Sequence, residues 1–162
     1  SITREAAKLT VEYVVEGNIS TIVLPRSNGE GAKRMGGLWE TTCFEMFLKN
    51  DISPHYLEFN FSPSGNWNCF SFEDYRQGMQ EYQGLSQLDI RMEGNEHKLV
   101  LTAEVALKRN SMFMEIYFKE KRIKTGISCV IENVLGVKSY WALCHPEARA
   151  DFHSDDSFML RP

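Results

Sequence analysis

Alternation of apolar and polar residues with a period of two is the feature that most constrains the fold of this chain. The longest example spans residues 98–107, where apolar side chains fill every second position: Leu99, Leu101, Ala103, Val105 and Leu107. Such alternation is typical of a strand with one buried face, because successive side chains point to opposite sides of the backbone. No segment longer than about ten residues shows a convincing helical period. We therefore expect a chain built almost entirely of strands.

Similar short segments recur along the sequence. The predicted strands cover residues 9–15, 20–24, 43–48, 56–62, 67–72, 88–92, 98–107, 112–118, 124–132 and 139–144, with a loop or single helical turn over 73–84. About nine or ten such strands with few short helices predict an all-β fold, an antiparallel β-sandwich of the jelly-roll or immunoglobulin-like kind. A length of 162 residues suits one core better than two, so we expect residues 1–162 to form a single domain.

Two hairpins are predicted from turn residues. The first joins 9–15 to 20–24, and the second joins 56–62 to 67–72 through a four-residue turn that pairs Ser62 with Trp67. Because a strand alternates its faces, this register sorts the side chains of the second hairpin into an apolar and a polar set. The inward face would hold Phe59, Phe70 and Phe72, together with Phe44, and the opposite face Glu58, Asn60, Ser62, Trp67 and Ser71.

Charge and cysteine usage exclude several classes of function. The net charge is −4 and the Lys and Arg residues are scattered, whereas nucleic-acid binding needs clustered cations. No apolar stretch approaches the roughly 18 residues of a membrane span. No basic-then-apolar leader is present, although processing before Ser1 would hide one. The cysteines lie far apart in apolar runs, which favours free thiols and a cytoplasmic location: Cys43, Cys69, Cys129 and Cys144.

Catalytic signatures are missing, which favours a protein that is not an enzyme and uses no cofactor. Two alternatives stay open. Glu45 and Glu58 on neighbouring strands resemble a glycosidase carboxylate pair. A loop near the C-terminus could hold a metal ion, because it carries imidazoles and carboxylates together: His145, Glu147, Asp151, His153 and Asp155.

Aromatic residues with polar neighbours are the best candidates for a binding site. Indole and phenol faces stack on the C–H surface of sugars, while Glu, Asn and Arg supply directional hydrogen bonds. We expect a small-molecule ligand, with a homo-oligomer also compatible with the sequence. The predicted ligand-binding residues are Trp39, Glu45, Glu58, Asn60, Trp67, Tyr75, Arg76 and Trp141.

Five segments of the sequence together resemble the bacterial DOMON-like domains, which are relatives of the family 9 carbohydrate-binding modules. These segments are residues 37–48, 56–67, 72–79, 139–146 and 151–153. The similarity extends over most of residues 9–160, and the combination is specific because no single piece is a common motif.

The resemblance implies an antiparallel β-sandwich that binds carbohydrate. In similar modules a Trp entering a strand, a Glu six residues later and an aromatic residue from a distant loop hold a terminal sugar. Trp39 and Glu45 match that spacing, and Trp141 is the candidate for the distant aromatic residue. Other DOMON domains bind haem through Met and His, so a haem- or metal-binding domain stays an alternative, as does a structural interaction domain.

Overall fold

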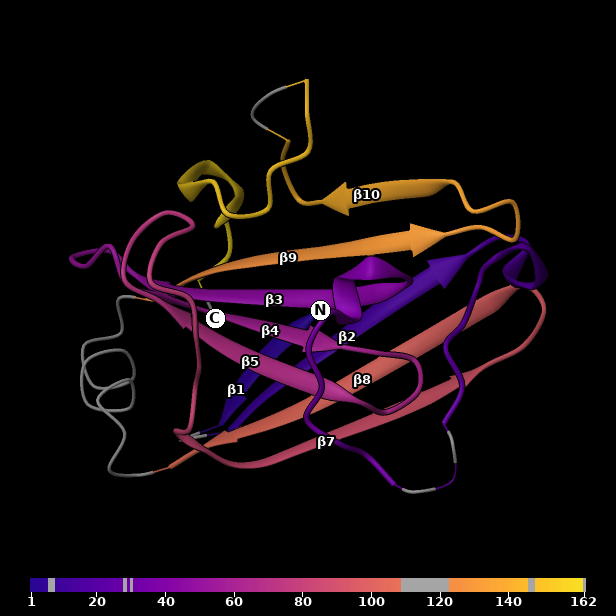
Figure 1. Ribbon diagram of the computed structural model, residues 1–162, viewed down its shortest axis with the longest axis horizontal. Coiled ribbons are helices and arrows are strands. Elements are labelled where there is room, and N and C mark those ends of the chain that lie inside the picture. Colours follow the sequence, from indigo (N-terminus) through magenta and orange to yellow (C-terminus); the bar gives the residue numbers. More distant parts are fainter. Residues whose placement is uncertain (6–7, 28, 30, 109–122, 146–147, 162) are drawn as a thin grey trace.

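The chain folds into two antiparallel β-sheets, shown in Figure 1. The computed structural model describes residues 1–162 with the exception of 6–7, 28, 30, 109–122, 146–147 and 162. Ten strands and only short 3₁₀ helices occur in this part of the chain, which confirms the predicted all-β sandwich. The strand predicted over 112–118 lies outside the described residues. No described helix is long and apolar enough to span a membrane.

The four-stranded sheet has the strand order β1-β2-β8-β7. Its inner face carries the long alternation found in the sequence, and Leu101 and Val105 are completely buried. Leucine and valine at alternate positions of β8 thus form one wall of the core, as predicted. The strands are β1 (Ile2–Glu5), β2 (Lys8–Glu16), β7 (Leu85–Gly94) and β8 (Lys98–Leu107).

The six-stranded sheet has the order β10-β9-β3-β4-β5-β6. Its central strands β3 and β4 are buried on both faces, unlike strands of a sheet with one solvated face. Strands in this sheet are β3 (Cys43–Asn50), β4 (Tyr56–Phe61), β5 (Trp67–Phe72), β6 (Gln80–Glu81), β9 (Ile123–Glu132) and β10 (Lys138–Ala142). The described 3₁₀ helices are η1 (Ile19–Thr21), η2 (Leu38–Glu40) and η4 (Asp155–Ser157).

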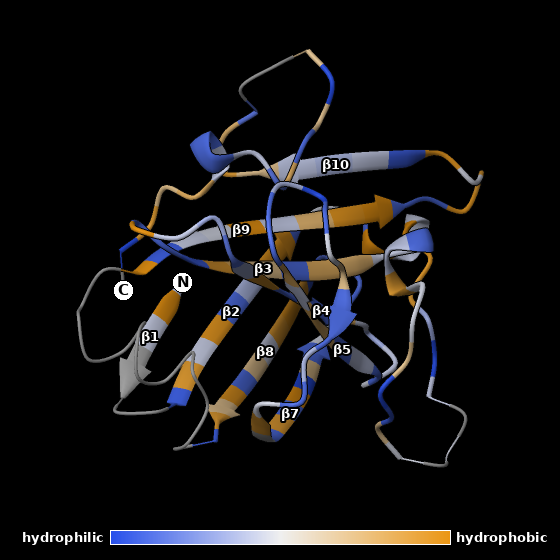
Figure 2. Cartoon of the chain, turned by 60° about the vertical axis from the view of Figure 1, so that its left-hand side comes forward, coloured by the Kyte–Doolittle hydropathy of each residue, from blue (hydrophilic) through white to orange (hydrophobic). Residues whose placement is uncertain are grey.

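Two hydrophobic clusters account for this double burial. The larger one fills the space between the sheets and includes Phe44, Phe59 and Leu101. The smaller one lies on the outer face of the six-stranded sheet, where the segment after β10 supplies Phe152 and Phe158. Figure 2 shows this segment above β9 and β3. The members of the outer cluster are Phe47, Tyr56, Phe70, Phe72, Val130, Phe152 and Phe158.

The predicted register of the β4–β5 hairpin is wrong by one residue. Phe61, not Ser62, pairs with Trp67, because the turn takes five residues and closes with a hydrogen bond from the Ser62 amide to the Asn66 carbonyl (2.9 Å). Gly65 provides the left-handed conformation that this turn requires (φ 87°). A shift of one residue exchanges the two faces of a strand. Phe70 and Phe72 therefore lie in the outer cluster, and Trp67 packs against the inter-sheet core.

The predicted hairpin between residues 9–15 and 20–24 is also wrong. Strand β2 pairs with β1 and β8, and η1 follows it in place of a strand. The backbone amide of Ile19 donates to the carbonyl of Glu96 at the β7–β8 turn (2.9 Å), and Ile22 then bridges to Asn133 at the end of β9. These long-range hydrogen bonds attach the segment after β2 first to the four-stranded sheet and then to the six-stranded sheet. Local turn residues do not predict such contacts.

Gly126 permits the close packing of the C-terminal segment on the outer face, and its replacement is a test of this arrangement. A Cβ atom at Gly126 would lie 2.6 Å from the ring of Phe158, which is itself stacked on Phe47 (5.6 Å). We expect Gly126→Ala to lower the free energy of unfolding by about 1–3 kcal/mol in urea denaturation, as is usual for overpacking. Gly36→Ala is the matched control, because no atom lies within 4 Å of its Cβ position. Equal stability of the two variants would contradict this packing.

Candidate functional site

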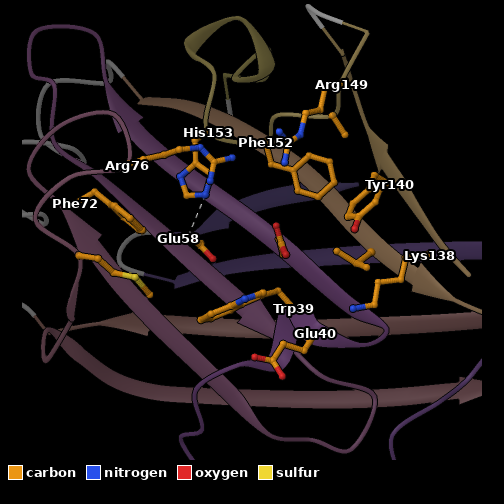
Figure 3. A pocket seen from close by; sticks show the side chains of 14 residues that line it. Trp39, Glu40, Glu58, Phe72, Arg76, Lys138, Tyr140, Arg149, Phe152 and His153 are labelled. Carbon is orange, nitrogen blue, oxygen red and sulfur yellow. Dashed lines mark ion pairs between the residues drawn. The ribbon is translucent and has the colours of Figure 1, made fainter. Parts of the chain in front are cut away.

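A cleft of about 570 Å³ lies over the outer face of the six-stranded sheet, and Figure 3 shows its side chains. The floor comes from β3, β4, β5 and β9. The walls come from η2, the loop after β5, strand β10 and the segment after β10. The lining residues are Trp39, Glu40, Glu45, Glu58, Phe72, Arg76, Met79, Val130, Lys138, Tyr140, Arg149, Ala150, Phe152 and His153.

Two buried acidic side chains form the polar part of the floor. Glu45 is 4% exposed and Glu58 is 5% exposed. They are diagonal neighbours on one face, because Glu45 pairs with Asn60, two residues beyond Glu58 on β4. The Asn60 amide donates to Oε1 of Glu58 (2.8 Å), and the Ser128 hydroxyl donates to Oε2 of Glu45 (3.4 Å). Among the described residues, none donates a hydrogen bond to Oε1 of Glu45.

Burial shifts the ionisation of both acids toward the protonated form. The pKa of Glu45 rises to about 8, chiefly because the site is desolvated and secondly because Glu58 is close. Desolvation also raises the pKa of Glu58, although the hydrogen bond from Asn60 opposes the rise. Glu45 is therefore mainly a neutral acid at pH 7, able to donate a hydrogen bond as well as to accept one.

His153 contacts Glu58 from the wall of the cleft. Its Nε2 lies 3.7 Å from Oε2 of Glu58, within ion-pair distance. Desolvation, assisted by the positive charge of Arg76, lowers the pKa of His153 to about 4. Desolvation also raises the pKa of Glu58, so the shifts of both groups oppose the formation of an ion pair between them.

The opposite nitrogen of His153 is oriented by Tyr56. The Tyr56 hydroxyl and Nδ1 of His153 are 2.7 Å apart, and the backbone amide of Arg76 donates to the same hydroxyl (3.1 Å). Burial raises the pKa of Tyr56 to about 12, so its phenol keeps its proton at neutral pH. Since the phenol oxygen accepts from Arg76, its proton is available for Nδ1 of His153. When the phenol donates to Nδ1, the neutral His153 carries its proton on Nε2, the nitrogen that faces Glu58.

Asp151 joins the loop after β5 to the segment after β10. Its Oδ1 accepts from Nη2 of Arg76 (2.7 Å) and from the backbone amide of His153 (3.1 Å), while its Oδ2 accepts from the Tyr75 hydroxyl (2.6 Å). Burial disfavours the charge, but the hydrogen bonds from Tyr75 and Arg76 outweigh it and lower the pKa of Asp151. Arg76 has a left-handed backbone (φ 54°), unusual for a residue other than glycine. The bonds to Asp151 and Tyr56 hold it in this conformation.

Trp39 forms an aromatic wall of the cleft. It lies in η2, which begins after Gly37 in a left-handed conformation (φ 71°). Its indole packs edge-on against Phe70 at 5.8 Å, and 37% of the residue is exposed. On β10, Lys138 and Tyr140 are two residues apart and share the face directed to the cleft. Figure 3 shows Tyr140 between Lys138 and Arg149 along one side.

Four of the predicted site residues come together in this cleft: Trp39, Glu45, Glu58 and Arg76. Two others lie next to it. Asn60 is completely buried and acts through its hydrogen bond to Glu58. Tyr75 is exposed and binds Asp151.

Two predicted tryptophans lie away from the cleft. Trp67 is on the opposite face of the sheet because of the register shift described above, and the guanidinium of Arg34 lies 4.5 Å from its ring. Trp141 pairs with Cys129, whose side chain faces the inter-sheet core, so its own side chain points away from the outer face. It is 63% exposed at the edge of the sheet. Its neighbour Tyr140 lines the cleft instead.

The C-terminal histidines do not assemble into the metal site considered from the sequence. His145 is exposed and contacts the backbone carbonyl of Tyr140 (3.1 Å), whereas His153 is bound to Tyr56. Among the described residues, no group of three His, Cys, Asp or Glu side chains is placed to hold a metal ion. Glu147 lies outside the described residues. His153 and Phe152 line the cleft, a placement that no sequence pattern in this loop indicates.

Comparison with known proteins supports the fold. No family model and no curated protein sequence matches the chain. A solved structure from Bacteroides uniformis ATCC 8492, of a protein proposed to bind carbohydrate, superposes with a TM-score of 0.60. The match covers 98% of this chain and 74% of that one, at 13% sequence identity. At this identity the similarity demonstrates a shared fold.

The raised pKa of Glu45 predicts a loss of stability as the pH rises toward about 8. The folded protein binds more protons than the unfolded chain between the ordinary glutamate pKa of 4.5 and the raised value of about 8, so stability decreases with rising pH in this window. His153 opposes this trend between pH 6.5 and about 4, where stability decreases as pH falls. We therefore expect Glu45 to dominate above pH 6.5, with a slope of at most about 1.4 kcal/mol per pH unit.

Urea denaturation of Glu45→Gln at a series of pH values tests this expectation. The amide cannot ionise, so the variant should gain stability relative to the wild-type protein as the pH rises from 6.5 to 8. His153→Gln should instead change the acid side of the profile, between about pH 4 and 6.5. Identical slopes of stability between pH 6.5 and 8 for Glu45→Gln and the wild-type protein would show that Glu45 is ionised in the folded state throughout this range.

Proposed function

We propose that this protein is a non-enzymatic binding module for a carbohydrate or sugar-like small molecule, and that the outer-face cleft is its binding site. The observation that carries the proposal is Glu45. Its carboxyl group is buried, lines an open cleft and leaves Oε1 without a donor among the described residues. A polar atom in such surroundings gains more from a ligand hydroxyl than an exposed one, because water competes less.

The chemistry of the floor suits a polyhydroxylated ligand. A sugar hydroxyl both donates and accepts, and a neutral Glu45 offers the same two possibilities. Glu58 is already oriented by Asn60 and His153, so it provides a second fixed partner close by. Two fixed partners discriminate between hydroxyl configurations better than one.

Aromatic walls supply the apolar half of the site. Trp39 and Tyr140 line the same cleft from separate elements, η2 and β10, and both are partly exposed. Their faces can cover the C–H surface of a sugar ring while its hydroxyls reach the floor. An aromatic residue combined with a few convergent polar groups is the usual composition of a small-molecule site.

Relationship to the DOMON-like domains and the family 9 carbohydrate-binding modules is part of the proposal. It is supported by Trp39 and Glu45, which have the spacing that the resemblance implies and line one cleft. The distant aromatic residue in this cleft is Tyr140 in place of the expected Trp141. The carbohydrate-binding function proposed for the Bacteroides uniformis protein agrees with a carbohydrate-binding role for this cleft.

Hydrolysis by Glu45 and Glu58 is less well supported than binding. Glycosidases of the usual kind need one carboxylic acid and one ionised carboxylate. Here desolvation raises the pKa of both side chains, which disfavours the ionised partner. The paired acids are better suited to hydrogen bonding than to nucleophilic attack.

Replacement of Trp39 should weaken ligand binding. Calorimetric titration with a panel of mono- and disaccharides, including amino sugars, first identifies a ligand of the wild-type protein. We then expect Trp39→Ala to weaken its binding about five- to tenfold, because a stacked aromatic contact contributes about 1 kcal/mol. Trp141→Ala, which removes an exposed indole outside the cleft, should leave the affinity unchanged.

Two results would contradict the proposed function. One is the absence of heat with every sugar of the panel at millimolar concentration. The other is an equal loss of affinity in Trp39→Ala and Trp141→Ala, which would place the binding site outside the cleft.

A further inference from the structure

The walls of the cleft carry two cations that form no ion pair with the described part of the chain. Arg76, Lys138 and Arg149 all line the cleft. Arg76 is paired with Asp151 at 2.7 Å. The side chains of Lys138 and Arg149, in contrast, form no ion pair or hydrogen bond with another described residue. Figure 3 shows both on the side of the cleft that also holds Tyr140.

Burial reduces the negative charge that the acids of the floor can offer to these cations. Desolvation keeps Glu45 mainly protonated at pH 7 and moves Glu58 in the same direction. His153 is mainly neutral. Of the remaining lining residues, only Glu40 is acidic. Lys138 and Arg149 therefore place two cations without a described ion-pair partner on one wall of the cleft, although the whole chain has a net charge of −4.

A ligand with a negative group would complete this arrangement. Lys138 and Arg149 provide several N–H donors at the wall, and charge-assisted hydrogen bonds to a carboxylate or sulfate are stronger than those between neutral groups. A cationic sugar would instead meet two like charges at this wall, above a floor in which Glu45 is mainly protonated. A neutral sugar would use the floor and the aromatic wall but leave both cations without a partner.

Building on the proposed function, we propose that the cleft selects an anionic sugar, whose negative group is bound by Lys138 and Arg149 while its hydroxyls reach Glu45 and Glu58. The shared chemistry is a carboxylate, sulfate or phosphate on a hydroxylated ring. Tyr140, which lies along the same wall, would cover the ring next to the charged group.

Matched pairs of sugars test this selectivity directly. Calorimetric titrations at pH 7 compare glucuronate with glucose, galacturonate with galactose, and N-acetylglucosamine 6-sulfate and 6-phosphate with N-acetylglucosamine. We expect the anionic member of at least one pair to bind about tenfold more tightly than its neutral counterpart. The advantage should decrease at high salt, because partly exposed charges are screened. The type of anion preferred separates carboxylate from sulfate and phosphate ligands.

A double variant shows whether the two cations are responsible. In Lys138→Gln/Arg149→Gln the ratio of anionic to neutral affinity should fall close to one. The matched control, Arg91→Gln/Lys98→Gln, removes two exposed cations from the four-stranded sheet and should keep the wild-type ratio.

The possible failures are distinguishable. Equal affinity for both members of every pair, or an unchanged ratio in the Lys138→Gln/Arg149→Gln variant, would overturn the anion selectivity and leave the proposed sugar binding intact. No binding of any anionic or neutral sugar to the wild-type protein would overturn both proposals.

Discussion

Strands β3 and β4 are buried on both faces, so each polar side chain that they place on the outer face needs a partner within the protein or in a ligand. Asn60 satisfies part of Glu58, and Ser128 satisfies part of Glu45. Oε1 of Glu45, which receives no hydrogen bond from the described residues, belongs to a side chain that lines the cleft. The unusual ionisation of these acids has the same origin, because the apolar side chains that cover the sheet also remove water from the carboxyl groups. The packing of the outer face and the chemistry of the cleft are thus two results of one layer of side chains.

Two segments far apart in the chain complete that layer. The loop after β5 and the segment after β10 meet at Asp151, which accepts hydrogen bonds from both. The bond to Asp151 also holds Arg76 next to Tyr56, whose hydroxyl accepts from the Arg76 amide. The same hydroxyl contacts Nδ1 of His153 and orients its ring. Except for Tyr56, the first residue of β4, these groups lie outside the strands, and hydrogen bonds among them and to Tyr56 fix their positions. The cleft therefore has walls of irregular backbone with defined side-chain positions.

Much of the fold could be predicted from the sequence, because alternation within a strand is a local property. The buried positions of β8 and the outward direction of Glu45 and Glu58 follow from it. The site could be predicted only in part. Trp67 was assigned to the wrong face because a five-residue turn is indistinguishable by residue type from a four-residue one. The cleft also contains side chains from β10 and from the segment after it: Tyr140, Arg149 and His153. They reach it because these parts of the chain pack against distant strands, and no local pattern encodes such long-range packing.

The division of the cleft between strands and loops has an evolutionary consequence. Its two buried acids, Glu45 and Glu58, lie in central strands of the six-stranded sheet, whereas its cations and its exposed aromatic side chains lie on η2, an edge strand and connecting segments. Substitutions at Lys138, Tyr140 or Arg149 disturb few core contacts, since these residues are exposed. Replacement of wall residues can therefore alter the shape and charge of the cleft while the floor and the fold persist.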